Sequence, residues 1–284
     1  MKKVQLVECP RDAMQGWKHF IPTEKKIDYI NSLLEVGFDT LDFGSFVSPR
    51  AIPQMADTKE VVQKLKVKSS STKLLAIVAN TRGAEEAVNY SEISYLGFPF
   101  SISPTFQMRN TNSSVEESLV RVEEIQDLCL KNNKQLVIYL SMGFGNPYKD
   151  EYNEEILLKW AEEMVKRDIK IISLADTIGM ATPQQISLTL NYLIPQYNDI
   201  VFGVHLHSTP GNWKQKLEAA VNAGCLRFDG ALHGIGGCPM AQDDLVGNMN
   251  TEFIISYLQG KNLLNGLNID ALQKSSELAS KIFV

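Results

Sequence analysis

The chain has 284 residues, of which 44% are hydrophobic, and a formal net charge of −5. This length suits one large α/β domain or two small ones. The acidic balance excludes nucleic acid and anionic membranes as generally expected partners, and no window approaches the roughly 18 apolar residues of a membrane span.

The first four residues contain too few apolar side chains to resemble a signal peptide. The four cysteines, Cys9, Cys129, Cys225 and Cys238, show no C-x-x-C spacing. Without a secretory signal, we interpret them as free thiols in a reducing compartment and expect a cytoplasmic protein.

Apolar runs alternate with helical patterns along the whole chain, and no low-complexity linker interrupts them. Several runs are apolar throughout, which is typical of parallel strands buried on both faces. Short polar residues mark expected helix starts at Thr23, Asp57, Ser114 and Thr182. The expected strands are 4–9, 38–44, 74–79, 93–98, 135–141, 169–175, 200–207 and 228–233.

Eight strands, each followed by a helix, in roughly 250 residues match a (β/α)8 TIM barrel. An open doubly wound sheet is the alternative, but no G-x-G-x-x-G follows the first strand. The sequence therefore predicts a single TIM-barrel catalytic domain over residues 1–284. The tail, 269–283, is expected to form an additional C-terminal helix outside the barrel.

The seventh expected strand ends in two histidines, His205 and His207. Because side chains alternate along a strand, both histidines point to the same face. Two core histidines with backbone partners are one interpretation. Desolvating two imidazoles on one face is costly, so we favour half of a metal site.

The C-terminal ends of barrel strands are where a TIM barrel carries its chemistry. Polar or ionisable residues follow six of the eight expected strands, which is more than solvated loops explain. These residues lie in the segments 8–12, 42–45, 141–145, 175–177, 205–207 and 233–239.

These strand-end motifs resemble the hydroxymethylglutaryl-CoA lyase family, within a superfamily of metal-dependent barrel lyases and Claisen-type condensing enzymes. The resemblance covers essentially the whole chain. Arg-Asp at 11–12 and His-x-His at 205–207 are shared by the superfamily. Ser-Phe-Val-Ser-Pro at 45–49 and Gly-Gly-Cys-Pro at 236–239 are more specific to the lyase.

The resemblance implies a divalent metal held by four residues. The implied ligands are Asp12, His205, His207 and Asn248. One carboxylate oxygen, two imidazole nitrogens and one amide oxygen leave two octahedral positions open, and this mostly hard set suits Mg²⁺ or Mn²⁺. A surface cap at Asp12 and a turn residue at Asn248 are the alternatives.

The resemblance also implies retro-Claisen cleavage of 3-hydroxy-3-methylglutaryl-CoA, a CoA thioester, to acetoacetate and acetyl-CoA. Arg11 would stabilise the developing enolate oxygen, and a structural ion pair with Glu8 or Asp42 is its alternative role. Cys238, in a glycine-rich loop, would be the thiol that protonates the enolate, and an inert buried cysteine is its alternative.

Further site residues follow from the same resemblance. In catalysis it implies Asp12, His205, Asp42 and Asp176 beside Arg11 and Cys238; in substrate binding it implies Gln15, Lys18, Ser45 and Thr177. Lys18 and Arg50 would lie near the phosphates of CoA.

The surroundings of the implied site depart from the family pattern. Ala13 stands where glycine is usual, and Asp42 replaces a longer glutamate. Ser208 follows the histidine pair where aspartate is usual, and the loop between Cys238 and Asn248 is one residue longer. The implied metal ligands are intact, so the sequence predicts a working enzyme.

His233 is a further departure, because the family has a small residue at this position. It follows the eighth expected strand, so we expect it to join a proton relay or to hold Asp176. A purely structural role is the alternative.

Three functions are weighed against one another. The leading hypothesis is the lyase; the second is a related metal-dependent aldolase or Claisen-type condensing enzyme acting on another 3-hydroxyacyl or 2-keto hydroxy acid. The third is a non-catalytic binding paralogue, which the presence of all four implied ligands disfavours. A homodimer is one assembly that the resemblance allows.

Overall fold

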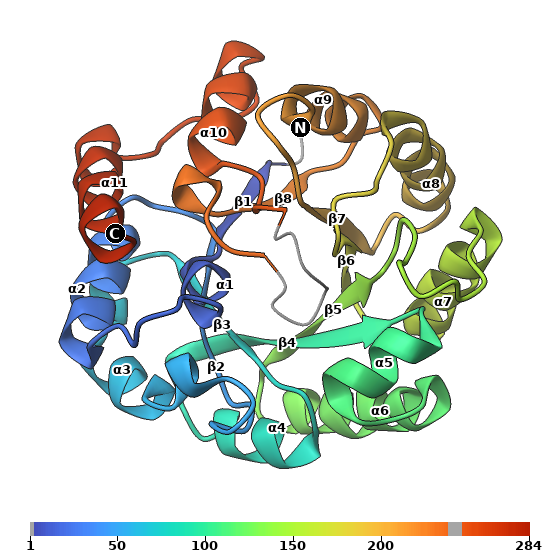
Figure 1. Ribbon diagram of the computed structural model, residues 1–284, viewed down its shortest axis with the longest axis horizontal. Helices are drawn as coiled ribbons and strands as arrows, with labels where there is room; N and C mark the ends of the chain where they lie inside the picture. The colour runs from blue at the N-terminus through green and yellow to red at the C-terminus, as the bar shows by residue number, and fades with distance from the viewer. Residues whose placement is uncertain (1–2, 238–245) are drawn as a thin grey trace.

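A closed barrel of eight parallel strands organises the structure, a computed structural model that describes residues 3–237 and 246–284. Neighbouring strands pair in chain order and the last pairs with the first, with helices around the outside (Figure 1). The predicted TIM barrel is confirmed. The strands are β1 (Gln5–Glu8), β2 (Thr40–Ser45), β3 (Lys73–Ile77), β4 (Ile93–Ser101), β5 (Gln135–Ser141), β6 (Ile171–Asp176), β7 (Val201–Leu206) and β8 (Arg227–Gly230).

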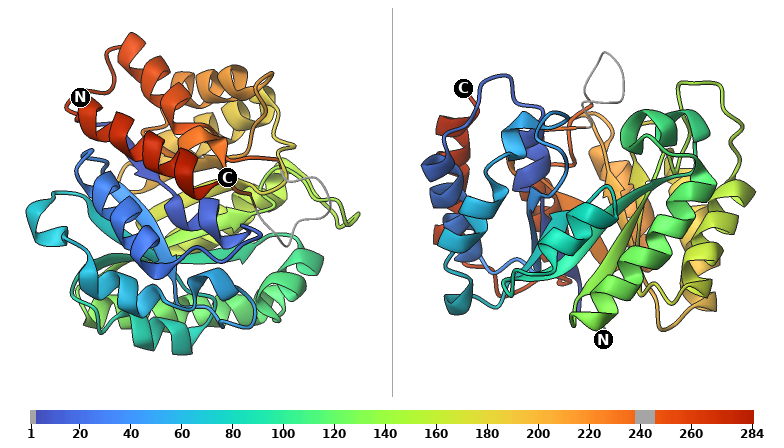
Figure 2. Two further views of the ribbon diagram at one scale, coloured as in Figure 1. Left: turned by 60° about the vertical axis from the view of Figure 1, so that its left-hand side comes forward. Right: turned by 90° about the horizontal axis from the view of Figure 1, so that it is seen from below.

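The helices stand around the strands, as the two views of Figure 2 show. They are α1 (Pro10–Gln15), α2 (Thr23–Leu34), α3 (Thr58–Lys64), α4 (Thr81–Ala87), α5 (Pro104–Thr111), α6 (Val115–Lys131), α7 (Glu154–Lys166), α8 (Pro183–Gln196), α9 (Trp213–Asn222), α10 (Thr251–Gly260) and α11 (Ile269–Ile282). Short 3₁₀ turns are η1 (Pro53–Met55), η2 (Val67–Ser69) and η3 (Leu232–Gly234).

Two of the predicted helix starts are full capping boxes. The Ser114 side chain caps α6 and the Thr182 side chain caps α8, each reciprocated by the residue three positions on. Asp57 precedes α3 as expected, but its side chain caps no backbone N–H. Its carboxylate instead binds the Lys26 ammonium at 2.7 Å and the Thr23 hydroxyl at 2.8 Å, so it joins α2 to α3.

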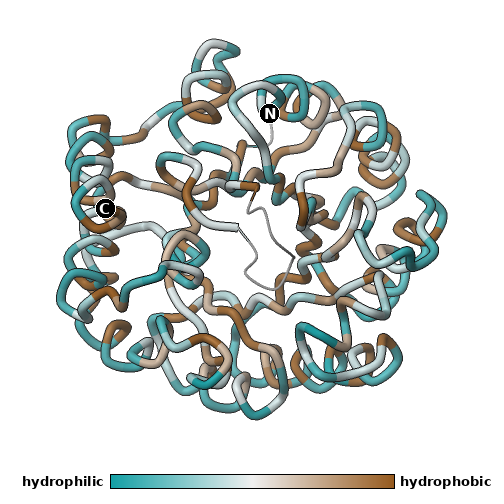
Figure 3. Tube along the Cα trace, viewed as in Figure 1, coloured by the Kyte–Doolittle hydropathy of each residue, from teal (hydrophilic) through white to brown (hydrophobic). Residues whose placement is uncertain are grey.

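Two apolar clusters hold the fold together. The larger lies between the strands and the helices, where the brown segments of Figure 3 face inward and the teal segments face outward. The smaller fills the inside of the barrel and consists of Leu75, Val137, Tyr139 and Ile171. Burying apolar area on both sides of the strands is the main stabilising term for such a sheet.

The predicted C-terminal helix is present as α11 and packs against α2. The Ser275 hydroxyl donates to the Ser32 hydroxyl at 2.9 Å in this buried contact. Phe283, after the helix, meets the Trp17 ring edge-on with centroids 5.2 Å apart. The tail therefore covers the outside of the barrel, as expected.

Cys9, Cys129 and Cys225 are buried free cysteines, whereas Cys238 lies outside the described residues. Within residues 3–237 and 246–284, no helix combines the length and apolar character needed to cross a membrane.

Glu8, the last residue of β1, fastens two later segments to the barrel. Its fully buried carboxyl accepts hydrogen bonds from the Leu232 backbone N–H at 2.9 Å and from the Thr251 hydroxyl. Burial raises the pKa of Glu8 to about 8 against the opposing effect of these two hydrogen bonds, and the charge of Glu252 adds to the rise. The carboxyl therefore anchors η3 and the start of α10 in its protonated form at neutral pH.

Replacing Glu8 by glutamine is expected to flatten the pH dependence of stability. The carboxyl titrates near its ordinary pKa of 4.5 when unfolded and near 8 when folded, so the free energy of unfolding falls as pH rises between these values. Glu8→Gln removes this titration, so melting temperatures measured from pH 5 to pH 8 should decline less than in the wild type. The exposed Glu116→Gln is the control, and an unchanged slope in Glu8→Gln would contradict the account.

Candidate active site

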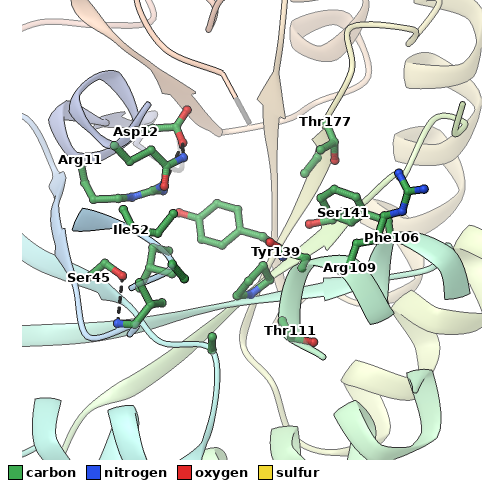
Figure 4. Close-up of a pocket in the computed structure, with 18 of the residues that line it drawn as sticks. Arg11, Asp12, Ser45, Ile52, Phe106, Arg109, Thr111, Tyr139, Ser141 and Thr177 are labelled. Carbon is green, nitrogen blue, oxygen red and sulfur yellow. Dashed lines mark hydrogen bonds and ion pairs between the residues drawn. The ribbon is translucent and has the colours of Figure 1, made fainter. Parts of the chain in front are cut away.

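A cavity of about 430 Å³ lies at the C-terminal ends of the strands. Figure 4 shows Arg11 and Asp12 on one side of it, Ser141 and Thr177 on the other, and the ring of Tyr139 between them. Seven predicted site residues line it: Arg11, Asp12, Gln15, Ser45, Thr177, His205 and His207. The structure therefore gathers residues from α1, from β2 and from the ends of β6 and β7 around one space.

Asp12, His205 and His207 form a group with the geometry of a metal site. One ligand atom from each lies within 4.8 Å of the other two, and the imidazole centroids are 5.4 Å apart. The histidines share a face because they are two residues apart at the end of β7. Asp12 reaches them from the first turn of α1, directly after β1.

Asn248 comes to the same place through its backbone. It forms an antiparallel bridge with His207, and its side-chain Nδ2 donates to Asp12 Oδ2 at 2.7 Å and to the Ile235 carbonyl at 2.9 Å. Among the described residues, its buried Oδ1 has no hydrogen-bond partner. A buried amide oxygen without a donor, next to a carboxylate and two imidazoles, fits a divalent cation as its missing partner.

Gly236 brings the glycine-rich loop against these ligands. It has a φ of 101°, and a Cβ there would lie 2.7 Å from both Asn248 Nδ2 and the Asp12 carbonyl oxygen. Any side chain would push the ligands apart, so this position needs glycine. The segment that leads to Cys238 therefore begins in contact with the candidate metal site.

Arg11 joins two buried carboxylates. Its Nε and Nη2 donate to Asp42 and its Nη1 donates to Asp12 Oδ1 at 2.8 Å, while Gln15 donates to the same Asp12 oxygen at 2.6 Å. The ion pair expected as the alternative role of Arg11 therefore forms with Asp42, whereas Glu8 binds Leu232 and Thr251. Two of the five guanidinium N–H groups stay available for a ligand in the cavity.

The charges keep Asp12 ionised. Burial raises its pKa, but the neighbouring charges, Arg11 first among them, bring the pKa below its ordinary value. Burial and the neighbouring His205 lower the pKa of His207 to about 4. A carboxylate and a neutral imidazole are the protonation states that bind a divalent cation.

The sequence model of the HMGL-like family matches residues 3–279 of this chain. The chain belongs to the HMGL-like family. It is similar to a hydroxymethylglutaryl-CoA lyase of Bacillus subtilis, with 32% identity over 97% of this chain and 92% of the relative. It is also similar to a cytoplasmic 3-hydroxy-3-methylglutaryl-CoA lyase of Rattus norvegicus, with 31% identity over 98% of this chain and 80% of the relative.

Solved structures of the family have the same barrel. The crystal structure of the Bacillus subtilis HMG-CoA lyase superposes with a TM-score of 0.92 at 31% identity, covering 99% of this chain and 94% of the other. An Acinetobacter baumannii HMG-CoA lyase in complex with coenzyme A and 3-methylmalate gives 0.91 at 30% identity, covering 99% and 91%. These relatives identify the chain as a carbon–carbon lyase of this family.

Two residues that the family resemblance assigned to catalysis do not line the cavity. Asp42 binds Arg11, and Asp176 accepts a hydrogen bond from the buried Lys216 ammonium at 2.6 Å and another from the Ala181 N–H at 2.9 Å. Lys216 also donates to the His207 carbonyl at 2.9 Å. Asp176 therefore contacts the site only indirectly, through Lys216, which also binds the His207 carbonyl.

The residues expected to bind substrate divide into two groups. Gln15 donates to Asp12, and the Thr177 hydroxyl accepts from the Met142 N–H at 2.8 Å. The Ser45 hydroxyl accepts from the Val47 N–H at 3.3 Å, so these three line the cavity with fixed side chains. Lys18 is exposed and does not line the cavity.

His233 does not lie where the sequence placed it. Its Nε2 is 2.7 Å from the Ser276 hydroxyl of α11, and its backbone N–H donates to Glu252 of α10. The residue has a φ of 61°, which turns its side chain to the outer helices. The predicted contact with Asp176 is therefore wrong, and a part in a proton relay stays a prediction.

Sequence reasoning missed Tyr139, Asp229 and Lys216. Tyr139 lines the cavity, and its buried hydroxyl has no hydrogen-bond partner among the described residues. Asp229 Oδ2 lies 3.3 Å from His205 Nδ1. The sequence signal that could have identified it is an acid inside the expected strand 228–233. Lys216 lies on α9 and carried no strand-end signal.

Removing the Lys216 ammonium is expected to destabilise the fold. Lys216→Met leaves the buried Asp176 carboxylate without its cation, which should lower the free energy of unfolding by about 3 kcal/mol. Denaturation by urea measures this loss. The exposed Lys214→Met on the same helix is the matched control, and equal stability of the two variants would refute a structural role for the Lys216–Asp176 pair.

Proposed function

We propose that this protein cleaves 3-hydroxy-3-methylglutaryl-CoA to acetoacetate and acetyl-CoA. One observation carries the proposal: Asp12, His205 and His207 converge beside the Arg11 guanidinium in the cavity of an HMGL-like barrel. An ionised acid, two imidazoles and a fixed cation are the groups that a metal-assisted retro-Claisen reaction requires.

Asp12, His205, His207 and Asn248 would hold one Mg²⁺ or Mn²⁺ ion, because oxygen and imidazole ligands suit these cations. When bound, the cation supplies Lewis acidity that lowers the pKa of the tertiary hydroxyl of the substrate. Asn248 would contribute its Oδ1, the buried acceptor without a partner among the described residues.

The chain's own groups would carry the remaining steps. A base takes the hydroxyl proton, and the bond between the hydroxyl-bearing carbon and the methylene carbon next to the thioester carbonyl breaks. The electron pair of that bond stays on the methylene carbon, so acetoacetate and the enolate of acetyl-CoA form. The two free N–H groups of Arg11 would donate to the enolate oxygen as its charge develops. A proton donor then converts the enolate carbon to the methyl group of acetyl-CoA, and Cys238 is the proposed donor.

Some of the residues predicted to take part in catalysis are held by ion pairs, and others face the cavity. Asp12 and His205 line the cavity, whereas Asp42 and Asp176 are held by the cations Arg11 and Lys216. We therefore assign Asp42 and Asp176 to positioning these cations, and keep Asp12 and His205 at the reacting atoms.

A CoA thioester fits the composition of the cavity. Beyond the charged end, Ile52, Ile77 and Phe106 give an apolar wall that suits an acyl chain and a pantetheine arm. Arg109 lines the cavity with its guanidinium stacked 4.7 Å from the Tyr148 ring. A relative solved with coenzyme A supports this substrate class. Exposed Lys18 and Arg50 remain the predicted partners of the phosphates.

We also propose a single catalytic domain, a homodimer and a cytoplasmic location. One closed barrel with its trailing helices supports the first, and the buried free thiols support the last. The homodimer rests on the family resemblance alone.

The direct test is turnover of the purified protein with 3-hydroxy-3-methylglutaryl-CoA in the presence of Mg²⁺ or Mn²⁺. Acetoacetate and acetyl-CoA should form in equal amounts, and a chelator should stop the reaction until metal is returned. Cleavage of a 2-keto hydroxy acid without cleavage of the CoA thioester would overturn the proposal in favour of a related aldolase.

Changing Arg11 to lysine should lower kcat by roughly 10²- to 10³-fold, because an ammonium cannot hold both carboxylates and also donate to the enolate oxygen. Steady-state kinetics with 3-hydroxy-3-methylglutaryl-CoA measures this effect, and circular dichroism checks the fold. Arg167→Lys is the control, since Arg167 forms ion pairs with Glu123 and Glu163 far from the cavity. Near wild-type turnover in Arg11→Lys would return Arg11 to a purely structural role.

A further inference from the structure

A buried row of polar residues lies beneath the candidate metal site. In the register of β7 and β8, Gly203 pairs with Arg227 and His205 pairs with Asp229. Arg227 and Asp229 are both almost completely buried. A Cβ at Gly203 would lie 3.0 Å from three side-chain carbons of Arg227, so this glycine leaves the space in which the arginine lies.

Asp229 contacts one of the two ring nitrogens of His205, Nδ1. Its Oδ2 lies 3.3 Å from His205 Nδ1 in the barrel interior. The second nitrogen, Nε2, is then free to face Asp12 and His207, which share a group of ligand atoms with His205. The strand register produces this contact, because paired residues on neighbouring parallel strands point to the same face.

Charge in this row is balanced by Arg227. Burial lowers the pKa of Arg227, but the nearby charge of Asp229 outweighs burial and raises it, so the guanidinium stays protonated. A carboxyl oxygen of Asp229 at 3.3 Å is an acceptor for the imidazole N–H of His205. This contact fixes the tautomer of His205 in which Nδ1 carries the proton.

We propose that Asp229 is a positioning residue that holds His205 with Nδ1 protonated and Nε2 turned to the divalent cation. This inference rests on the metal site of the proposed function. A carboxylate behind a ligating histidine fixes the ring and makes it a better ligand.

His205 and Asp229 also belong to a second group of residues that could bind a metal ion. Cys9, His205 and Asp229 also place one ligand atom each within 4.8 Å of the others. The cation of Arg227 beside Asp229 opposes another positive charge there, so we assign the carboxylate to His205. The test separates the two uses.

The test measures Mn²⁺ binding to the whole protein by electron paramagnetic resonance and calorimetry. Asp229→Ala should weaken Mn²⁺ binding by roughly 10- to 100-fold. Asp229→Asn should recover part of the loss, because its amide oxygen still accepts from His205. Ser173→Ala is the matched control: Ser173 pairs with Gly203 in the same buried row, its Oγ lacks a hydrogen-bond partner among the described residues, and its loss should leave affinity unchanged.

A double variant separates positioning from folding. Asp229→Ala removes a nearby acid whose charge offsets that of the buried Arg227 cation, so it can lower the melting temperature by itself. Combining it with Arg227→Met removes that charge. We expect the double variant to melt closer to the wild type while Mn²⁺ binding stays weak.

Three results would overturn the inference. Wild-type affinity in Asp229→Ala would show that His205 needs no positioning, and recovery of affinity in the double variant would reduce the effect to folding. With Co²⁺ as the probe, a thiolate charge-transfer band that disappears in Cys9→Ser would place the metal on the Cys9 side. A wild-type protein that binds no Mn²⁺ would overturn the proposed metal site itself, which distinguishes the two failures.

Discussion

The contact on which the rest of the site depends is the ion pair of Arg11 with two buried carboxylates. Burial alone raises the pKa of Asp12, and a protonated acid would be a poor ligand. The neighbouring charges, the guanidinium first, lower the pKa of Asp12 and keep it ionised. Because Asp42 holds the other edge of the guanidinium, the cation has a fixed direction and presents its remaining N–H groups to the cavity. Binding a cation and stabilising an enolate thus require the same arrangement.

Strand register supplies the second constraint. His205 and His207 share a face of β7, the paired Asp229 of β8 lies behind His205, and the bridge from His207 brings in Asn248. Two glycines allow these side chains to pack closely. Gly203 leaves space for Arg227, and Gly236 packs against Asn248 and Asp12. Lys216 then binds the His207 carbonyl and Asp176 together, so the end of β7 is held from outside the barrel as well.

Much of this could be predicted from the sequence because periodicity is a local signal. Apolar runs and capping residues predicted the strands and several helices. The spacing of two residues between the histidines predicted that they share a face of their strand. The position of Asp12 beside them followed from barrel topology and the family motifs. Contacts set by distant packing could not be predicted. Lys216 reaches Asp176 across 40 positions, and His233 turns outward because of a positive φ that its residue type does not dictate. Cys238 lies outside the described residues, so its role stays a prediction.

The central claim is that these side chains form one divalent-metal site, and anomalous diffraction from a crystal soaked in MnCl₂ tests it most directly. The account predicts a single strong peak at the C-terminal end of the barrel, within about 2.0–2.6 Å of Asp12, His205, His207 and the Asn248 amide oxygen. A fully occupied peak elsewhere, or well-ordered ligands around an empty site at saturating Mn²⁺, would contradict it.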